Sequence, residues 1–442
     1  MDYKTDINAR KYLLIQLLQE IENQEDRILQ ALYDDFKKPF FEGLLTETSF
    51  VKSELKSTIN NMHRWSKPKS ILPSLLNFPS RDFIYKEPYG KVLIIAPWNY
   101  PFQLAICPMI GAIAAGNQVV VKPSELTPNT AQIITEIVSK IFDKNHVTVI
   151  EGDHEVAQNL LTKRWDYIFF TGSVGVGKIV AKAAAEFLTP VTLELGGKNP
   201  CIIDQTADLA LAAKRIVWGK FINAGQTCIA PDYLLVHTAV KKTLTAFLIT
   251  ELKAAYTDNS QDSADFCRIV NFKNWERLTQ LLIGNNIVFG GASDPNDLFL
   301  APTLIDEPDI ESTLMKDEIF GPILPILSYQ NDAEIATFIN RYEKPLALYV
   351  FSTNQAFTKK IITDYAFGGG CINDTMIHFA NNRLPFGGVG NSGVGAYHGR
   401  LSFDAFSHHK AIVKKFNWLD LPFRYAPYGN KLATIRKLLR WF

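Results

Sequence analysis

Residues 91–123 of the chain are KVLIIAPWNYPFQLAICPMIGAIAAGNQVVVKP. The short apolar runs at residues 91–97 and 117–123 are bounded by proline and predict two buried strands. Residues 103–116 between them have the length and composition of a helix that ends at Gly116. A strand, a helix and a second strand in succession predict a parallel strand pair joined by a right-handed crossover.

The same alternation continues along the chain. Residues 147–152 and 167–172 predict two more strands, and residues 178–188 predict a helix that opens near Lys178. After about residue 195 a second unit of short strands and helices begins. Residues 4–65 carry apolar side chains at helical spacing and predict two or three amphipathic helices before the sheet. We therefore expect an α/β protein with Rossmann-like parallel sheets.

The composition narrows the class of protein. The chain has 442 residues, of which 47% are hydrophobic and 21% are charged, which is typical of a globular protein of two or three domains. A net charge of +1 gives no electrostatic case for nucleic acid as a partner. We expect no membrane span, because no apolar run approaches about 20 residues. The charged, helix-patterned N-terminus is unlike a signal peptide.

The cysteines point to a reducing compartment. The chain has five, an odd number, and they are far apart with no CxxC pair: Cys107, Cys201, Cys228, Cys267 and Cys371. This pattern argues against a disulfide framework and against a zinc site. We expect a cytoplasmic protein that binds no metal.

A glycine-rich segment, YIFFTGSVGVGK, residues 167–178, is a candidate phosphate site. A predicted strand runs into Gly172, Ser173, Gly175 and Gly177, and backbone N–H groups at a helix N-terminus can bind a phosphate. The order is not the GxGxxG of a standard Rossmann fingerprint. It fits GxxxxGK, but a P-loop needs Ser or Thr where Ile179 stands. A turn that binds nothing remains an equal alternative for this motif alone.

Polar residues follow several predicted strands, where ligands of a parallel sheet bind. Lys122 and Glu125 in VKPSE could hydrogen-bond ribose hydroxyls, although a solvated loop is the simpler reading. Glu194 in LELGGKNP could be a general base, or an exposed strand-end residue. Glu318 in KDEIFGP is open to the same two interpretations as Glu194. Asn99 in PWNYP could donate to an oxyanion, although an asparagine in a turn is usually structural.

Cys228 lies in FINAGQTCIAP, residues 221–231, among small and polar residues. A cysteine placed for packing usually has bulky apolar neighbours, whereas small neighbours let backbone and ligand approach the sulfur. Two interpretations stay open from the residues alone: a nucleophile, or a small buried hydrophobe. No histidine forms a known local pair with it, so a papain-like protease has little support.

Taken together, these segments resemble the aldehyde dehydrogenase superfamily across nearly the whole chain. The motifs that carry the resemblance occur in the family's order: PWNYP, VKPSE, FTGSVGVGK, LELGGKNP, GQTCIAP, EIFGP and LPFGGVGNSG. The details look most like the class 3 branch of fatty and aromatic aldehyde dehydrogenases, because of GQTCIAPDY, NSGVGAYHG, RYAPYGNK and the short N-terminus.

The resemblance implies a Rossmann-like cofactor domain, a second α/β catalytic domain and a small bridging sheet used for oligomerisation. The implied boundaries are 1–69 and 89–195 for the NAD-binding domain, 196–406 for the catalytic domain, 70–88 and 407–425 for the bridging strands, and 426–442 for a C-terminal tail. It also implies a homodimer. For the basic tail, we expect packing on protein rather than membrane contact.

The resemblance also implies a role for each motif. Cys228 matches the catalytic nucleophile, Glu194 the general base and Asn99 the oxyanion-stabilising amide. The positions that match dinucleotide-binding residues are Lys122, Glu125, Gly172, Ser173, Gly175, Gly177, Glu318 and Phe320. The implied cofactor is NAD, with NADP tolerated.

The implied reaction is oxidation of medium- to long-chain aliphatic or aromatic aldehydes to carboxylic acids, through a thiohemiacetal and a thioester on Cys228. Sulfur suits both halves, because a thiolate is a strong nucleophile and leaves a thioester readily. A CoA-acylating aldehyde dehydrogenase is an alternative that would not need Glu194. A P-loop-type nucleotide-binding protein is a second alternative. It is less favoured because Ile179 stands where a P-loop needs Ser or Thr.

Overall fold

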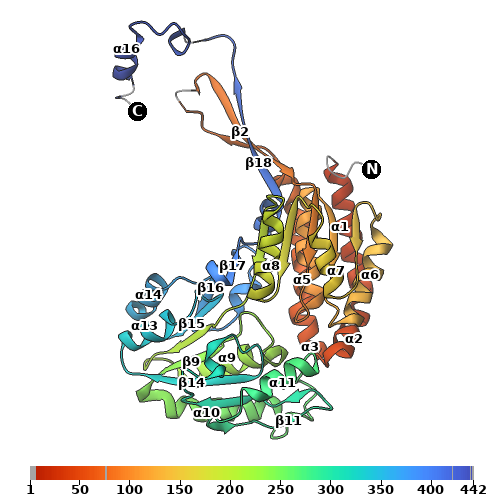
Figure 1. Cartoon of the computed structure of the whole chain (residues 1–442), viewed down its shortest axis with the longest axis vertical. Coiled ribbons are helices and arrows are strands. Elements are labelled where there is room, and N and C mark those ends of the chain that lie inside the picture. Colours follow the sequence, from red (N-terminus) through yellow and green to blue (C-terminus); the bar gives the residue numbers. More distant parts are fainter. Residues whose placement is uncertain (1–5, 75–76, 421, 439, 441–442) are drawn as a thin grey trace. The chain divides into compact units, whose positions relative to one another are not determined.

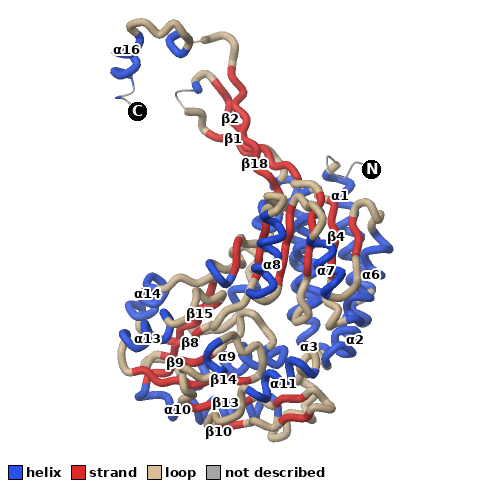
Figure 2. Tube along the Cα trace, in the orientation of Figure 1, coloured by secondary structure: helices blue, strands red, loops and turns tan. Residues whose placement is uncertain are grey.

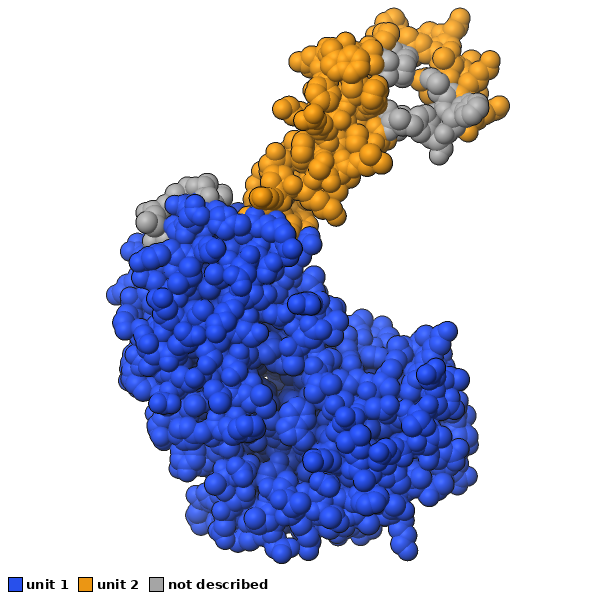
Figure 3. Space-filling view, turned by 180° about the vertical axis from the view of Figure 1, so that it is seen from behind, with its two compact units in different colours: residues 1–65, 88–408 blue, residues 66–87, 409–442 orange. Residues whose placement is uncertain are grey.

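The computed structural model describes residues 6–74, 77–420, 422–438 and 440. The chain divides into two compact units, Met1–Trp65 with Pro88–His408, and Ser66–Glu87 with His409–Phe442 (Figure 3). The first unit contains two large sheets with their helices, and the second contains the three strands of a small sheet.

The first large sheet in the described part of the chain has six strands in the order β17-β7-β6-β3-β4-β5. Figure 2 shows strands of this sheet, among them β4, as red segments near the blue helices α6, α7 and α8. Their bounds are β3 Lys91–Ile95, β4 Gln118–Lys122, β5 Val147–Val149, β6 Tyr167–Thr171, β7 Val191–Glu194 and β17 Gly393–Val394. All neighbours pair in parallel except β17, which is antiparallel to β7. The predicted parallel sheet is therefore confirmed.

Helices cover both faces of this sheet (Figure 1). The helices that precede the sheet in sequence are α1 Ile7–Asn23, α2 Glu25–Phe36, α3 Phe40–Gly43, the π-helix η1 Leu44–Thr48 and α4 Ser49–Trp65. The helices between its strands are α5 Pro101–Ala115, α6 Pro128–Ile141, α7 His154–Leu161 and α8 Val174–Ala185. Helix α15 Arg400–Ala405 comes after strand β17. Alternate residues of β3 face opposite sides: Val92 and Ile94 pack in the large core, and Leu93 and Ile95 pack with Val180 of α8.

Helix α5 is buried over its whole length, because it lies between strands β3 and β4 and helices α1 and α4. A helix that is apolar on every side suits such a position. Its first turn follows directly on the PWNY segment, so burial of α5 fixes the place of Asn99.

The second large sheet in the described residues has seven strands in the order β10-β13-β14-β9-β8-β15-β16. Their bounds are β8 Pro200–Ile203, β9 Tyr233–His237, β10 Ile287–Phe289, β13 Thr303–Asp306, β14 Ile323–Tyr329, β15 Ala347–Phe351 and β16 Gly369–Ile372. Only β10 pairs antiparallel. This is the second α/β unit expected after residue 195.

The helices of this second half are α9 Leu209–Phe221, α10 Thr238–Tyr256, α11 Phe272–Gln280, α12 Thr313–Lys316, α13 Asp332–Asn340 and α14 Gln355–Asp364. Short elements complete it: η3 Ile222–Gly225, the pair β11 Ser293–Asp294 and β12 Phe299–Leu300, η4 Ile377–Ala380 and η5 Gly390–Ser392. The loops that follow α9 and α12 carry the Cys228 and Glu318 motifs.

The small sheet has the order β1-β2-β18 within the described residues. Its strands are β1 Lys69–Ile71, β2 Ser80–Pro88 and β18 Ser407–Lys415, and η6 Pro422–Arg424 and α16 Lys431–Leu438 follow. The ranges 70–88 and 407–425, expected to hold bridging strands, thus contain β2 and β18, which are neighbours in one sheet. None of the described helices combines the length and the apolar character that crossing a membrane requires.

Candidate active site

Cys228 follows a sharp turn at the end of α9. Within η3, Asn223 and Ala224 have left-handed backbones with φ of 55° and 50°, and Gly225 has φ of 71°. A side chain at Gly225 would also be impossible, because its Cβ would lie 2.4 Å from the carbonyl oxygen of Gly321. The small residues before Cys228 are therefore required by the path of the backbone itself.

Gln226 holds this turn from inside. Its Nε2 donates to the carbonyl oxygens of Asn223 and Arg268 at 3.1 and 3.0 Å, and its Oε1 accepts from the backbone N–H of Val270 at 3.0 Å. The side chain is fully buried. A buried amide with three partners fixes a loop in one conformation.

Asn199, in the loop before β8, holds the other side of Cys228. Its Nδ2 donates to the carbonyl oxygens of Cys228 and Ala230 at 2.8 and 3.1 Å, and its Oδ1 accepts from the N–H of Ala347 at 2.9 Å. The loop that carries the cysteine is thus fastened to two strands of the second sheet.

The turn that carries Asn99 is fastened to the same loop. The Nδ2 of Asn99 donates to the carbonyl oxygen of Gln226 at 3.0 Å, and the Nδ2 of Asn223 donates to the carbonyl oxygen of Asn99 at 3.0 Å. Tyr100 and Thr227 share a hydrogen bond of 2.6 Å between their hydroxyls. An amide has two N–H bonds, so one N–H of Asn99 anchors the side chain and the other is left for a ligand.

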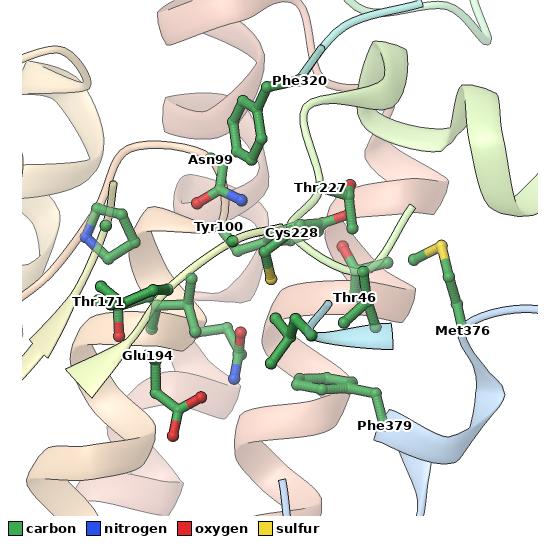
Figure 4. A pocket seen from close by; sticks show the side chains of 18 of the residues that line it. Thr46, Asn99, Tyr100, Thr171, Glu194, Thr227, Cys228, Phe320, Met376 and Phe379 are labelled. Atoms are coloured by element: carbon green, nitrogen blue, oxygen red, sulfur yellow. The ribbon is translucent and has the colours of Figure 1, made fainter. Parts of the chain in front are cut away.

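A cavity of about 620 Å³ brings the predicted catalytic residues together (Figure 4). Cys228, Asn99 and Glu194 all line it, and the sulfur of Cys228 points into it. Of the predicted cofactor residues, Gly172, Ser173, Glu318 and Phe320 also line it, whereas Lys122, Glu125, Gly175 and Gly177 do not. Its walls include many large apolar side chains: Leu45, Phe50, Trp98, Leu104, Trp218, Ile222, Met376, Ile377, Phe379 and Phe386.

Burial shifts every titrating group at the centre of the cavity. Burial raises the pKa of the Cys228 thiol above its ordinary value, the carboxylates of Glu318 and Glu194 raise it further, and backbone N–H groups of Cys228 and Ile229 act in the opposite direction. Burial also raises the pKa of Glu194 well above 4.5 and that of Glu318 to about 8. Burial therefore favours the neutral thiol and the neutral carboxyls, and each carboxyl is a stronger base than an exposed one once it loses its proton.

Glu318 is positioned by a buried ion pair. Lys198 and Asp232 are joined at 2.7 Å; Lys198 donates to the carbonyl oxygen of Asp317, and Asp232 accepts from the N–H of Ile319. The Glu318 carboxylate lies against Gly196, where a Cβ would come within 2.1 Å of its Oε2. The ELGGK segment thus needs glycine for Glu318 to approach and lysine to hold the segment around it.

The glycine-rich segment differs from the prediction. Helix α8 begins at Val174, not near Lys178, because the Oγ of Ser173 caps it by accepting from the N–H of Val176. Gly175 and Gly177 are therefore inside the first turns. A Cβ at Gly177 would lie 2.6 Å from the side chain of Leu195, whereas a Cβ at Gly175 would meet open space. A helix here leaves no loop of the kind that wraps phosphates in a P-loop, so that alternative is wrong.

Lys122 is the last residue of β4, and Glu125 lies in the loop just past it. The Nζ of Lys122 and the Oε2 of Glu125 are 2.5 Å apart. The lysine is buried and the glutamate partly exposed. The pair presents a carboxylate with one oxygen still available at the carboxyl end of the parallel sheet, where the ligands of such sheets bind.

Sequence reasoning missed the residues that hold or line the site without reacting. Gln226, Asn199, Tyr100 and Thr227 stand inside quoted motifs, but nothing in the local pattern shows that their partners are distant. Phe379 and its neighbours come from η4, which no motif marked. The only local signal is a short, mostly apolar segment, MIHFA at residues 376–380, outside any periodic pattern.

Comparison with known proteins agrees with this geometry. The model of the Aldehyde dehydrogenase family matches residues 3–412. The chain is 49% identical to the 4,4'-diaponeurosporen-aldehyde dehydrogenase of Staphylococcus aureus (strain NCTC 8325 / PS 47) over 437 residues, which are 98% of this chain and 95% of that protein. It is 45% identical to aldehyde dehydrogenase family 3 member A2 of Pongo abelii over 395 residues, 89% of this chain and 81% of that protein.

Among solved structures, the Mycobacterium tuberculosis aldehyde dehydrogenase complexed with NAD+ superimposes with a TM-score of 0.86 at 25% identity, covering 95% of this chain and 88% of that chain. The fold, the order of the motifs and the relatives all indicate the same family. The family 3 relative confirms the predicted resemblance to the class 3 branch. The chain belongs to the aldehyde dehydrogenase family.

Proposed function

We propose that this chain is an NAD(P)-dependent aldehyde dehydrogenase that oxidises apolar aldehydes to carboxylic acids through a thioester on Cys228. One observation carries the proposal: the Cys228 sulfur, the Asn99 amide and the Glu194 carboxyl line one largely apolar cavity. A nucleophile, an oxyanion donor and a base are the three groups that thioester chemistry needs.

The first half-reaction is the addition of sulfur to the aldehyde. The Cys228 thiol releases its proton to water, its sulfur bonds to the carbonyl carbon, and the electron pair of the C=O π bond moves to the oxygen, which carries the negative charge of the thiohemiacetal. The free N–H of Asn99 and the backbone N–H of Cys228 stabilise that oxygen. When the oxyanion collapses, a hydride leaves the carbon and a thioester remains; bound NAD+ supplies the acceptor for that hydride.

The second half-reaction is hydrolysis. Glu194 takes a proton from water, the hydroxide adds to the thioester carbon, and the same donors stabilise the second oxyanion. The C–S bond then breaks and releases the carboxylic acid, and the Cys228 thiolate takes up the proton held by Glu194. In Figure 4 the Glu194 carboxylate is turned away from the Cys228 sulfur, so its side chain has to rotate before it acts. A carboxyl whose pKa is raised by burial suits this role.

The residues present fit a dinucleotide. Glu318 has a buried Oε1 without a partner among the described residues, which suits a ribose hydroxyl, and Phe320 lies beside it in the cavity. The N-terminus of α8, with Ser173 and the open space at Gly175, suits a pyrophosphate. Lys122 and Glu125 suit the adenosine ribose. Because a carboxylate repels a 2′-phosphate, we propose NAD as the preferred cofactor, with NADP tolerated.

The substrate is proposed to be a medium- to long-chain aliphatic or an aromatic aldehyde. The cavity walls are mostly apolar, and each buried CH₂ contributes about 0.8 kcal/mol. The name of the Staphylococcus aureus relative, which specifies a diaponeurosporen aldehyde, supports a long apolar substrate. Hydrolysis rather than transfer to CoA is supported by Glu194, which only the hydrolytic reaction requires.

We further propose that residues 1–69 and 89–195 form the NAD-binding domain and that residues 196–406 form the catalytic domain. We also propose that the enzyme is cytoplasmic and that it is a homodimer joined through strand β18. Seven consecutive residues of β18, from His408 to Lys414, are exposed at the edge of the small sheet. An exposed edge strand needs a partner or protection.

A kinetic panel tests the function. Aliphatic aldehydes from about two to sixteen carbons, together with aromatic aldehydes, are assayed for NADH and NADPH formation. We expect kcat/KM to rise with chain length at first, by up to about fourfold per CH₂. A maximum at acetaldehyde would contradict the substrate class, and absence of activity with every aldehyde would contradict the function.

A further inference from the structure

The first turn of α5 has no capping side chain of its own. Tyr100 is its N-cap and makes no side-chain cap hydrogen bond, and Pro101 at the first helical position has no N–H. The N–H groups of Phe102 and Gln103 donate instead to Oε2 of Glu47, at 3.1 and 2.9 Å. Glu47 is more than fifty residues away in sequence. Its carboxylate therefore caps the N-terminus of α5, the helix that follows Asn99.

The other oxygen of Glu47 is held by a buried cation. Lys38 Nζ lies 2.7 Å from Glu47 Oε1, and neither side chain has any exposure to solvent. The same Nζ lies 4.0 Å from the centre of the Tyr100 ring. The pair therefore touches the Asn99 turn on two sides, at the N–H groups that follow it and at the ring beside it.

The backbone is adapted to present Glu47. It lies in the π-helix η1, whose wider turn shifts the register of the side chains that follow. Leu45 and Thr46 of the same turn line the cavity. One turn therefore supplies two residues of the cavity wall and the carboxylate that caps α5. A buried ion pair is a costly way to gain stability, since an apolar pair of similar volume often serves as well.

We propose that Glu47, held by Lys38, is a positioning residue that keeps the Asn99 amide directed at the oxygen bound to Cys228, an inference that rests on the proposed function. Two anchors hold Asn99 from the cysteine side, the carbonyl of Gln226 and the amide of Asn223. Glu47 supplies the third, from the helix side. Glu47 touches no reacting atom, so its effect on the rate is indirect.

A double-mutant cycle tests this. Glu47→Gln keeps the volume, but its single carbonyl oxygen can serve either the helix N–H groups or Lys38, not both. We expect the NADH burst of Glu47→Gln to slow by about 10- to 100-fold, somewhat less than the loss of an oxyanion donor. In an Asn99→Ala background the further loss is expected to stay below about threefold, because both changes remove one effect.

Two further measurements separate positioning from general damage. Alkylation of Cys228 by iodoacetamide needs the thiol but no oxyanion donor, so its rate is expected to change by less than about threefold in Glu47→Gln. Glu54→Gln is the matched control, since Glu54 is also a buried carboxylate that accepts from a backbone N–H, that of Gly399, away from the Asn99 turn.

Each outcome has a separate meaning. If Asn99→Ala leaves the burst unchanged, the proposed function fails. If Asn99→Ala is slow and Glu47→Gln is no slower than Glu54→Gln, or if the Glu47 and Asn99 losses multiply in full, the positioning role is overturned. Should Glu47→Gln not fold, the double variant Lys38→Met/Glu47→Gln replaces it in the cycle, because a neutral pair removes the unpaired buried charge.

Discussion

The hydroxyl of Tyr100 lies 2.6 Å from the hydroxyl of Thr227. Tyr100 directly follows Asn99, and Thr227 directly precedes Cys228. This hydrogen bond therefore joins the proposed oxyanion donor to the proposed nucleophile through two side chains that do not react. Tyr100 follows strand β3 of the first sheet and Thr227 lies in the loop before strand β9 of the second, so the bond links segments that belong to the two sheets.

Tyr100→Phe is expected to lower both stability and kcat. The substitution leaves the buried Thr227 hydroxyl unpartnered, which costs about 1 to 3 kcal/mol in the free energy of unfolding. Urea unfolding and steady-state kinetics measure the two effects. Tyr233→Phe is the control: the Tyr233 hydroxyl is buried without a hydrogen-bond partner among the described residues, so its removal should cost little. Equal losses in the two variants would contradict the role of the Tyr100 hydroxyl.

The rate of thioester hydrolysis is expected to rise with pH. Burial raises the pKa of Glu194 well above 4.5, and only its deprotonated form accepts a proton from water, so the active fraction grows as pH rises through the raised pKa. A pH profile of kcat between about pH 6 and 10 measures this. A flat or falling profile would argue against Glu194 as the base.

The same shift has a consequence for stability. Because the pKa of Glu194 is higher in the folded protein than in the unfolded chain, the protonated carboxyl favours folding at low pH. That contribution is lost as pH rises through the folded pKa. In thermal unfolding, we expect Tm to fall by less in Glu194→Gln than in the wild type as pH rises from about 4.5 through the raised pKa.

Glu125→Gln is expected to shift cofactor preference toward NADP. The change removes the charge that repels a 2′-phosphate, and it leaves Lys122, which now has no anionic partner, to attract one. The ratio of kcat/KM for NADP to that for NAD should rise by about tenfold or more, which corresponds to about 1.4 kcal/mol. An unchanged ratio would show that Glu125 does not face the adenosine ribose.

A dimer is expected in solution. Light scattering at micromolar concentration should give about twice the 49.7 kDa of the chain. Val413 is exposed in β18, and Val413→Pro removes a backbone donor from this strand, so we expect it to weaken pairing through β18 and to shift the equilibrium toward monomer. A monomeric wild type would contradict the assembly, and a Val413→Pro dimer as stable as the wild type would place the interface elsewhere.

Much of the fold was predictable because short apolar strands alternate with helices, and a parallel sheet follows from that alternation. The proposed catalytic residues could be nominated because each motif stands at the end of a strand or helix, where polar residues break the apolar pattern, and because the order of the motifs resembles that of a known family. The start of α8 was misplaced because glycine is a poor helix former; the Ser173 cap and the packing of Gly177 on Leu195 outweigh that propensity.

The supporting contacts were out of reach for a different reason. Glu47 and Phe102 are far apart in sequence, and a buried glutamate in a helical segment looks the same as an exposed one. The raised pKa values of Glu194 and Glu318 likewise depend on burial by distant elements. Local patterns show which residues have chemistry, but not which residues hold them in place.

The most direct test of the mechanism is pre-steady-state NADH formation by Glu194→Gln. Gln is close to Glu in size but cannot accept the water's proton, and neither Glu194 oxygen has a hydrogen-bond partner among the described residues, so Tm should not fall. We predict a burst approaching one NADH per active site, then a steady state slower than wild type by about 10² to 10⁴. Acid quenching should leave the acyl group on Cys228, and Cys228→Ala should show neither burst nor turnover. An unimpaired steady state in Glu194→Gln, or turnover by Cys228→Ala, would contradict the account.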